Sequence, residues 1–254
     1  MLKFKKEITG VQSPWIIGVY EQYFSNKTDG FLVEIGVGGT INWQAMGHRW
    51  PYMLDWDKEW DDGKIIRGGN HTLELVEQGW KGIYIESLHE LIDNELKPLL
   101  DKILPEEYKD NVTIIKSGAS DKKRICKISH HENLEECPSD VEDIDEIIPY
   151  EYHLHGGRKL YCEKTSTLLE DNNCPKDIDL MVIDVEGHEL HVLKGIDFDK
   201  HLPKMMFIET DKISVNSIMD IIPDDYIVLC SDGLNTMFIL EDFYKGPFVG
   251  KVNH

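Results

Sequence analysis

Short apolar runs recur along the chain, and several of them end at a glycine or an acidic residue. Such runs suit strands buried on both faces of a parallel sheet. The runs fall at 31–33, 83–85, Val112–Lys116, 180–183 and 204–210, and a terminal hairpin follows at 226–230 and 237–240. Five strand–helix units and a hairpin predict an α/β fold. We expect a seven-stranded, mostly parallel sheet with one antiparallel strand and helices on both faces. Residues 13–24 predict a covering helix with Pro14 near its first turn.

The run at 180–183 stops abruptly at Asp184, and Glu186, His188 and Glu189 follow at once. In open α/β sheets ligands bind beyond the carboxyl ends of the strands. Acidic groups there can bind a metal, take a proton or hold a sugar. The competing interpretation is a strand followed by a solvated helix start, because acidic residues favour helix N-termini. On this segment alone the two interpretations are equally good.

A glycine-bearing strand end lies upstream, where residues 31–40 read FLVEIGVGGT. Glycines after a first strand let the backbone turn tightly and approach a nucleotide-like ligand. The dinucleotide fingerprint GxGxxG fails, because its third glycine would fall at Ile41. The form E-x-G-x-G, made by Glu34, Gly36 and Gly38, instead resembles the first motif of S-adenosylmethionine-dependent methyltransferases. In those enzymes the loop passes the amino-acid end of the cofactor.

Glu86 closes the next apolar strand. An acidic residue at this point is the usual partner for ribose hydroxyls, since a carboxylate can accept two hydrogen bonds from a vicinal diol. The usual spacing from the glycine loop is about twenty residues, and here it is much longer. The difference predicts an insertion at about 41–69, after which the segment from Asn70 resumes as the capped start of the first helix.

The predicted insertion at 41–69 is rich in tryptophan and aspartate, and Trp43 is its first aromatic residue. Its aromatic side chains can stack on the apolar face of a sugar ring, or they can anchor a loop to the core. The alternation of Trp and Asp favours a carbohydrate site, because a glycan needs both a flat apolar surface and hydrogen-bond acceptors.

Three longer segments are collinear with the glycine loop over roughly residues 30–210: NHTLELVEQGWKGIYIES, TLLEDNNCPKDIDLMVIDVEGHELHVLKGIDF and KMMFIET. Together they resemble the FkbM family of S-adenosylmethionine-dependent O-methyltransferases, and D-x-E-G-x-E-x-x-x-L-K-G is the most specific part. The resemblance implies a Rossmann-like class I methyltransferase fold and methylation of hydroxyl groups, often on sugars or polyketide-like products. Met181, where the family often has Lys, and the two inserts depart from the pattern. Because of these departures, the resemblance does not determine which acceptor is methylated.

The resemblance also implies that S-adenosylmethionine contacts residues along the strand ends: Glu34, Gly36, Gly38, Thr72, Glu86, Ser87, Ala119, Ser120 and Asp184. Ala119 and Ser120 belong to a predicted loop at 117–121, which in a methyltransferase lies beside the adenine. A plain turn rich in Ser, Gly and Asp explains that loop equally well.

Methyl transfer requires in-line attack by the acceptor oxygen, so positioning contributes much of the rate. A hydroxyl is a poor nucleophile while protonated, and the site therefore needs a base or a cation. Asp184, Glu186, His188 and Glu209 are expected to cluster beyond the strand ends. In one scheme Asp184 and Glu209 hold Mg²⁺ or Mn²⁺; in the other, His188 or Asp184 is the general base. A structural role for His188, as a polar residue in the first turn of a helix, is at least as good an interpretation as a catalytic role. Glu189 is interpreted as a helix cap or loop brace.

We expect a second insert, of irregular structure, at about 122–162. This connection is longer than a normal strand–helix connection. It is either a lid over the acceptor or a mobile acidic loop. A structural zinc site is improbable there, since no cysteine stands at ligand spacing. The candidate substrate residues are Trp43, Tyr152, His153, His155, Arg158 and Glu186.

The chain has 47 acidic and 27 basic residues, giving a formal charge of −20. Such a polyanion is repelled by nucleic-acid phosphates and anionic lipid, which argues against a nucleic-acid methyltransferase. Five scattered cysteines without a CxxC motif favour free thiols in a reducing compartment. No apolar run has membrane-spanning length, and the first residues lack a signal-peptide core. We therefore expect a cytoplasmic protein with a single domain at 1–254 and no membrane insertion. A homo-oligomer or a longer multidomain parent protein is compatible with this sequence.

Two functions of other classes compete with methyl transfer. A nicotinamide-dependent oxidoreductase uses the same acidic strand end, but the missing third glycine argues against it. A noncatalytic glycan-binding or scaffold module on a methyltransferase fold is the second alternative. In that alternative the chain would have lost its catalytic residues. The presence of Asp184, Glu186 and Glu209 argues against such a loss.

Overall fold

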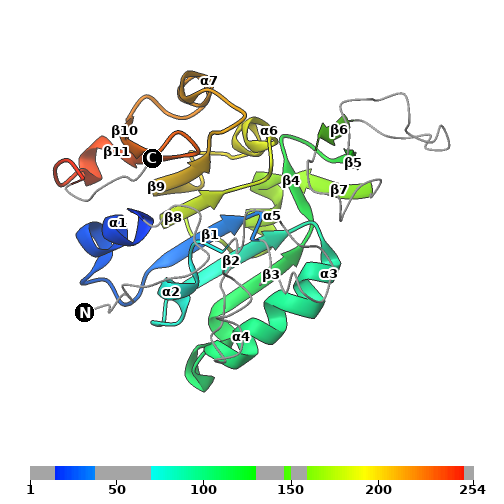
Figure 1. Cartoon of the computed structure of the whole chain (residues 1–254), viewed down its shortest axis with the longest axis horizontal. Helices are drawn as coiled ribbons and strands as arrows, with labels where there is room; N and C mark the ends of the chain where they lie inside the picture. The colour runs from blue at the N-terminus through cyan, green and yellow to red at the C-terminus, as the bar shows by residue number, and fades with distance from the viewer. Residues whose placement is uncertain (1–14, 38–69, 130–145, 150–158, 249–254) are drawn as a thin grey trace, which may run out of the picture.

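The structure, a computed structural model, describes residues 15–37, 70–129, 146–149 and 159–248. Seven strands form one sheet in the order β10-β11-β9-β8-β1-β2-β3 (Figure 1). All neighbouring pairs are parallel except the two that β11 makes with β9 and β10. The predicted mostly parallel sheet with one antiparallel strand is therefore confirmed. The strands are β1 Phe31–Ile35, β2 Lys81–Glu86, β3 Val112–Lys116, β8 Asp177–Ile183, β9 Leu202–Glu209, β10 Tyr226–Ser231 and β11 Asn235–Leu240.

Helices cover both faces of this sheet. One face carries α1 (Trp15–Phe24), α2 (Leu73–Val76) and a continuous helical segment of α3 (His89–Leu91), a π-helical turn (Ile92–Leu96) and α4 (Lys97–Ile103). The other face carries α5 (Thr165–Asp171), α6 (Glu189–Lys194) and α7 (Val215–Met219). Two short 3-10 turns complete the described helices, at Glu106–Asn111 and Glu241–Phe243.

The alternation of side chains along each strand divides the core into two layers. Leu32 and Leu180 pack in the layer of α1 and α2, whereas their neighbours Val33 and Met181 pack in the layer of α5 and α6. All four side chains are fully buried. Because both faces of β1 and β8 are covered, both positions of the alternation must be apolar. This explains why the runs in the sequence contain so few polar residues.

The parallel register brings the carboxyl ends of the central strands to one edge of the sheet. Ile35 in β1 lies opposite Ile85 in β2 and Ile183 in β8, and Ile183 lies opposite Ile208 in β9. One residue further, the Gly36 N–H donates to the Ile85 carbonyl (2.9 Å). The acidic and glycine residues that end these strands are therefore neighbours in space.

A second, four-stranded sheet corrects the expectation of irregular structure between 121 and 162. Its order is β4-β7-β5-β6, and it lies beyond the end of the main sheet (Figure 1). β5 and β7 pair antiparallel although a long stretch of sequence separates them. Such non-local pairing leaves no local mark, and charged residues interrupt the alternation in both strands. The strands are β4 Gly118–Ser120, β5 Arg124–Ser129, β6 Glu146–Pro149 and β7 Lys159–Lys164.

The first helix that the structure describes after β1, α2, begins at the predicted place. The Asn70 side-chain oxygen accepts hydrogen bonds from the N–H groups of Thr72 (3.0 Å) and Leu73 (2.8 Å), and so satisfies two donors at the start of α2. The predicted insertion at 41–69 lies outside the described residues. Within the described ranges, no helix has the length and apolar character needed to cross a membrane. The single-domain assignment of 1–254 stays a prediction.

Candidate active site

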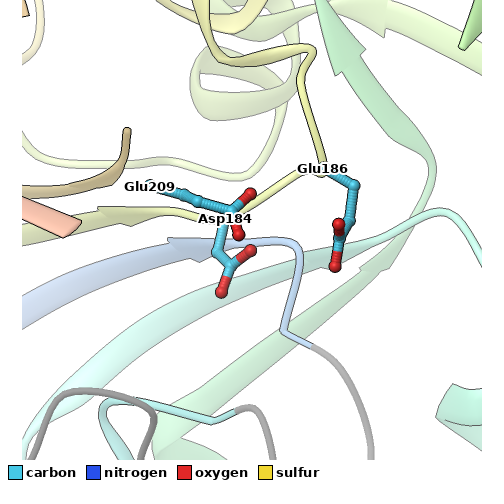
Figure 2. Close-up of side chains that lie close together, drawn as sticks. All are labelled: Asp184, Glu186 and Glu209. Atoms are coloured by element: carbon cyan, nitrogen blue, oxygen red, sulfur yellow. The ribbon is translucent and has the colours of Figure 1, made fainter. Parts of the chain in front are cut away.

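Three of the acidic residues expected at the strand ends lie together. Asp184 directly follows β8, Glu209 is the last residue of β9, and Glu186 lies on the turn between β8 and α6. One carboxylate oxygen from each lies within 4.8 Å of the others. Figure 2 shows the Asp184 and Glu209 carboxylates next to each other, with Glu186 beside them on the turn. We call these three residues the acidic cluster.

Glu209 is the most buried member of the acidic cluster, with 7% of its surface exposed. Its Oε2 atom is buried and has no hydrogen-bond partner among the described residues. Burial raises the pKa of the Glu209 carboxyl, and the negative charges of Asp184 and Glu186 raise it further. A buried acceptor without a partner costs about 1–3 kcal/mol, and a charged one costs more. The cluster therefore contains a destabilising feature that the described residues do not relieve.

Lys212, on the segment after β9, compensates part of this negative charge. Its Nζ atom lies 2.9 Å from Glu186 Oε2. Burial raises the pKa of Glu186, and this hydrogen bond opposes the shift. Lys212 could not be identified from the sequence, because only the fold brings the segment after β9 next to the turn after β8.

The turn that carries Glu186 has an unusual backbone, since Glu186 and Gly187 have φ angles of +58° and +101°. Few residues other than glycine adopt positive φ, and such strain is often found at functional sites. Glu189 Oε1 holds the turn in place by accepting hydrogen bonds from the N–H groups of Val185 (3.1 Å) and Gly187 (2.9 Å). Glu189 is thus the loop brace that the sequence analysis favoured.

His71 contacts the acidic cluster and was missed as a site residue. Its buried side chain places Nε2 3.3 Å from Asp184 Oδ2. The ring packs against Phe207 at 4.7 Å between centroids. Burial lowers the pKa of His71, but the hydrogen bond to Asp184 and the charges of Asp184 and Glu34 outweigh it, and the net shift is upward. The only feature of the sequence that pointed to a role for His71 in the site was its position in the NHT segment, which follows the glycine loop.

Glu34 and Thr72, both predicted to bind the cofactor, form a hydrogen bond with each other. Glu34 is fully buried and accepts hydrogen bonds from the His71 N–H (2.8 Å) and from the Thr72 hydroxyl. The Thr72 hydroxyl also lies 2.8 Å from the Tyr84 hydroxyl. Burial raises the pKa of Glu34 to about 7, although the neighbouring His71 opposes this shift. The pair fixes the backbone at His71, and its contact with a cofactor stays a prediction.

Gly36 is a position where only glycine fits. Its φ angle is +80°, and a Cβ atom there would lie 1.7 Å from the Asp184 carbonyl oxygen. The ends of β1 and β8 therefore lie too close to each other for a side chain at position 36. Gly38, the other glycine of the motif, lies outside the described residues.

Glu86 ends β2 on the same edge and is 6% exposed. Its Oε1 atom accepts hydrogen bonds from the Leu88 N–H (2.8 Å) and the Ser87 hydroxyl (3.2 Å). The side chain thus orders the turn that follows β2. Hydrogen bonding to a ribose by Glu86 and Ser87 stays a prediction.

Ala119 and Ser120 lie in strand β4 and not in the loop that the sequence suggested. Gly118–Ser120 pairs with β7, so the backbone that looked like a turn takes part in the second sheet. The Ser120 hydroxyl is buried and lies 3.1 Å from His188 Nε2. His188 directly precedes α6 and stacks on His191 at 4.5 Å between centroids. This geometry favours the interpretation of His188 as a polar residue at the helix start.

The remaining predicted site residues lie outside the described residues. They are Gly38, Trp43, Tyr152, His153, His155 and Arg158. Their roles at the cofactor and the acceptor stay predictions.

Comparisons with known proteins identify the family. A family model described as the methyltransferase FkbM domain matches residues 68–224, more than half of the chain and the part that contains the acidic cluster. A crystal structure of the methyltransferase FkbM from Methylobacillus flagellatus KT is similar at 14% identity with a TM-score of 0.45. It aligns over 87% of this chain and 47% of the other, so this chain spans about half the length of that protein. No protein of curated function matches. The chain belongs to the FkbM methyltransferase family.

Proposed function

We propose that this protein transfers a methyl group from S-adenosylmethionine to a hydroxyl group of a sugar or glycan. The observation that carries the proposal is the meeting of Gly36, Glu86 and the acidic cluster at one edge of the sheet. Open α/β sheets bind their ligands at this edge. Membership in a methyltransferase family supports methyl transfer as the chemistry.

The residues at this edge fit S-adenosylmethionine. Gly36 lets the backbones at the ends of β1 and β8 lie against each other, and the amino-acid end of the cofactor would bind beside this pair of strand ends. Glu86, at the end of the neighbouring strand, would accept hydrogen bonds from the ribose diol. Ala119 and Ser120 would lie beside the adenine. When bound, the cofactor supplies an activated methyl group on a sulfonium centre, and the protein supplies binding and orientation.

Asp184 is the residue that we propose for activation of the acceptor. His71 holds one Asp184 oxygen at 3.3 Å, which restricts the rotation of the carboxylate. In the first scheme Asp184 takes the proton of the acceptor hydroxyl as a general base. In the second, Asp184 and Glu209 would hold Mg²⁺ or Mn²⁺, whose charge favours the alkoxide. Both schemes leave the in-line alignment of the acceptor oxygen to the protein.

A polyhydroxylated acceptor agrees with the charge of the protein. Carboxylates are strong acceptors for hydroxyl donors, and the acidic cluster offers several at one place. The formal charge of −20 disfavours a polyanionic acceptor such as nucleic acid. A neutral or cationic sugar meets no such repulsion.

Measurement of S-adenosylhomocysteine tests the proposal. The full chain is incubated with S-adenosylmethionine, with and without added Mg²⁺, and with a panel of mono- and oligosaccharides. We expect S-adenosylhomocysteine and a methyl ether to form in equal amounts with at least one acceptor. Product no greater than with heat-denatured protein, for every acceptor, would contradict the proposal. Saturable glycan binding without turnover would favour the noncatalytic module instead.

A further inference from the structure

The acidic cluster carries more negative charge than the described residues compensate. Lys212 pairs with Glu186, and His71 pairs with Asp184. No described cation pairs with Glu209, and its Oε2 atom is buried without a hydrogen-bond partner in the described part of the chain. Buried polar atoms in native proteins nearly always have partners, and an exception often marks an ion or an ordered water. The Glu209 carboxylate is directed toward Asp184, into the cluster (Figure 2).

The spacing of the three carboxylates suits a single divalent cation. Magnesium–oxygen distances are about 2.0–2.1 Å and calcium–oxygen distances about 2.3–2.6 Å, so two ligands of one ion lie at most about 4–5 Å apart. The oxygen atoms of the acidic cluster lie within 4.8 Å of one another. All three donors are hard oxygen ligands, which suit Mg²⁺, Mn²⁺ or Ca²⁺ better than softer metals.

We infer that Asp184, Glu186 and Glu209 form one divalent-cation site, with Glu186 as a third protein ligand. Its use in catalysis rests on the proposed function and selects the cation scheme over the general base. Glu186 was a candidate substrate residue in the sequence, and the cluster geometry gives it a different role. His71 holds only Oδ2 of Asp184, and a carboxylate has a second oxygen to offer a cation.

Lys212 is the internal competitor of the cation. Its ammonium group occupies Glu186 Oε2 at 2.9 Å and places a positive charge at the edge of the site. When a cation binds, Glu186 exchanges Lys212 for the ion. Removal of the ammonium charge should therefore tighten cation binding by at least about threefold to tenfold, since this is the repulsion of two positive charges a few ångströms apart even in bulk water. A purely structural Glu186–Lys212 pair predicts no such gain.

Titration with Mn²⁺ monitored by electron paramagnetic resonance tests the site directly. The loss of the free-ion signal is followed on the full chain, without S-adenosylmethionine or acceptor, at about 0.15 M salt to screen diffuse binding to the acidic surface. We expect a single saturable site for which Mg²⁺ competes. Glu209→Gln and Glu186→Gln should each weaken binding by at least about tenfold, whereas Lys212→Met should tighten it.

The pair Lys200–Glu170 provides matched controls, because it is a similar Lys–Glu contact (3.0 Å) on an exposed surface. Lys200→Met and Glu170→Gln should leave Mn²⁺ binding unchanged, and thermal unfolding verifies that every variant is folded. Absence of a saturable site, or wild-type affinity in Glu186→Gln, would overturn the inference. Because this assay uses neither cofactor nor acceptor, such a result leaves methyl transfer with Asp184 as a base intact. Conversely, a Mn²⁺-loaded chain without turnover contradicts the proposed function alone.

Discussion

Replacement of Asp184 by asparagine is expected to lower kcat/KM for methyl transfer by about a hundredfold or more. Both schemes for activating the acceptor need the negative charge of Asp184, and a positioned acid–base group contributes about 10²–10⁴-fold to a rate. Asparagine keeps the shape of the side chain and can still bond to His71, so the fold should persist. Formation of S-adenosylhomocysteine at saturating cofactor measures the effect.

A control for this substitution lies at the start of β8, the strand that Asp184 follows. Asp177 is the first residue of β8, at the opposite edge of the sheet, and it is exposed. Asp177→Asn makes the same chemical change and should leave turnover at the wild-type level. If Asp184→Asn retained full turnover with an unchanged melting temperature, Asp184 would have no role in activating the acceptor.

Substitution of Gly36 by alanine is the second large effect that we expect, here on stability. The left-handed backbone at Gly36 costs a residue with a side chain about 1–2 kcal/mol. The added Cβ atom would also lie 1.7 Å from the Asp184 carbonyl oxygen, a contact that only a backbone shift can relieve. We expect a total loss above about 3 kcal/mol, in the range of severe point substitutions. Urea denaturation measures it.

Gly233 separates the two contributions. Its φ angle is +90°, and a Cβ atom there would meet nothing within 4 Å. Gly233→Ala should therefore show the backbone cost alone. If Gly36→Ala were no more destabilising than Gly233→Ala, the ends of β1 and β8 would not lie as close together as described.

The centre of the main sheet was predictable because its strands β1, β2, β8 and β9 are buried on both faces. Leu32 and Val33 point to opposite layers, and both are apolar, so β1 is visible in the sequence as a continuous run. The second sheet was not predictable on the same basis. Arg124–Ser129 and Lys159–Lys164 carry charged residues, and they pair across a long separation that no local pattern records.

The candidate site was predictable only as far as strand topology determines it. Asp184 and Glu209 end adjacent parallel strands, so their meeting follows from the order of the strands. His71 and Lys212 lie on connecting segments, and their contacts depend on the path of the chain in three dimensions. Glu34 shows a further limit, because a motif position cannot distinguish a buried hydrogen bond to Thr72 from a contact with a ligand.

Binding of S-adenosylmethionine at these strand ends underlies the proposed function, and calorimetric titration of the cofactor into the full chain measures that binding itself. Glu86→Gln serves as the comparison, because glutamine can still accept the Leu88 N–H bond while it loses the charge that would bind the ribose diol. We expect saturable binding of one cofactor per chain, weakened by about tenfold or more in the variant. Undetectable binding to the wild-type chain, or equal affinity in Glu86→Gln, would contradict it.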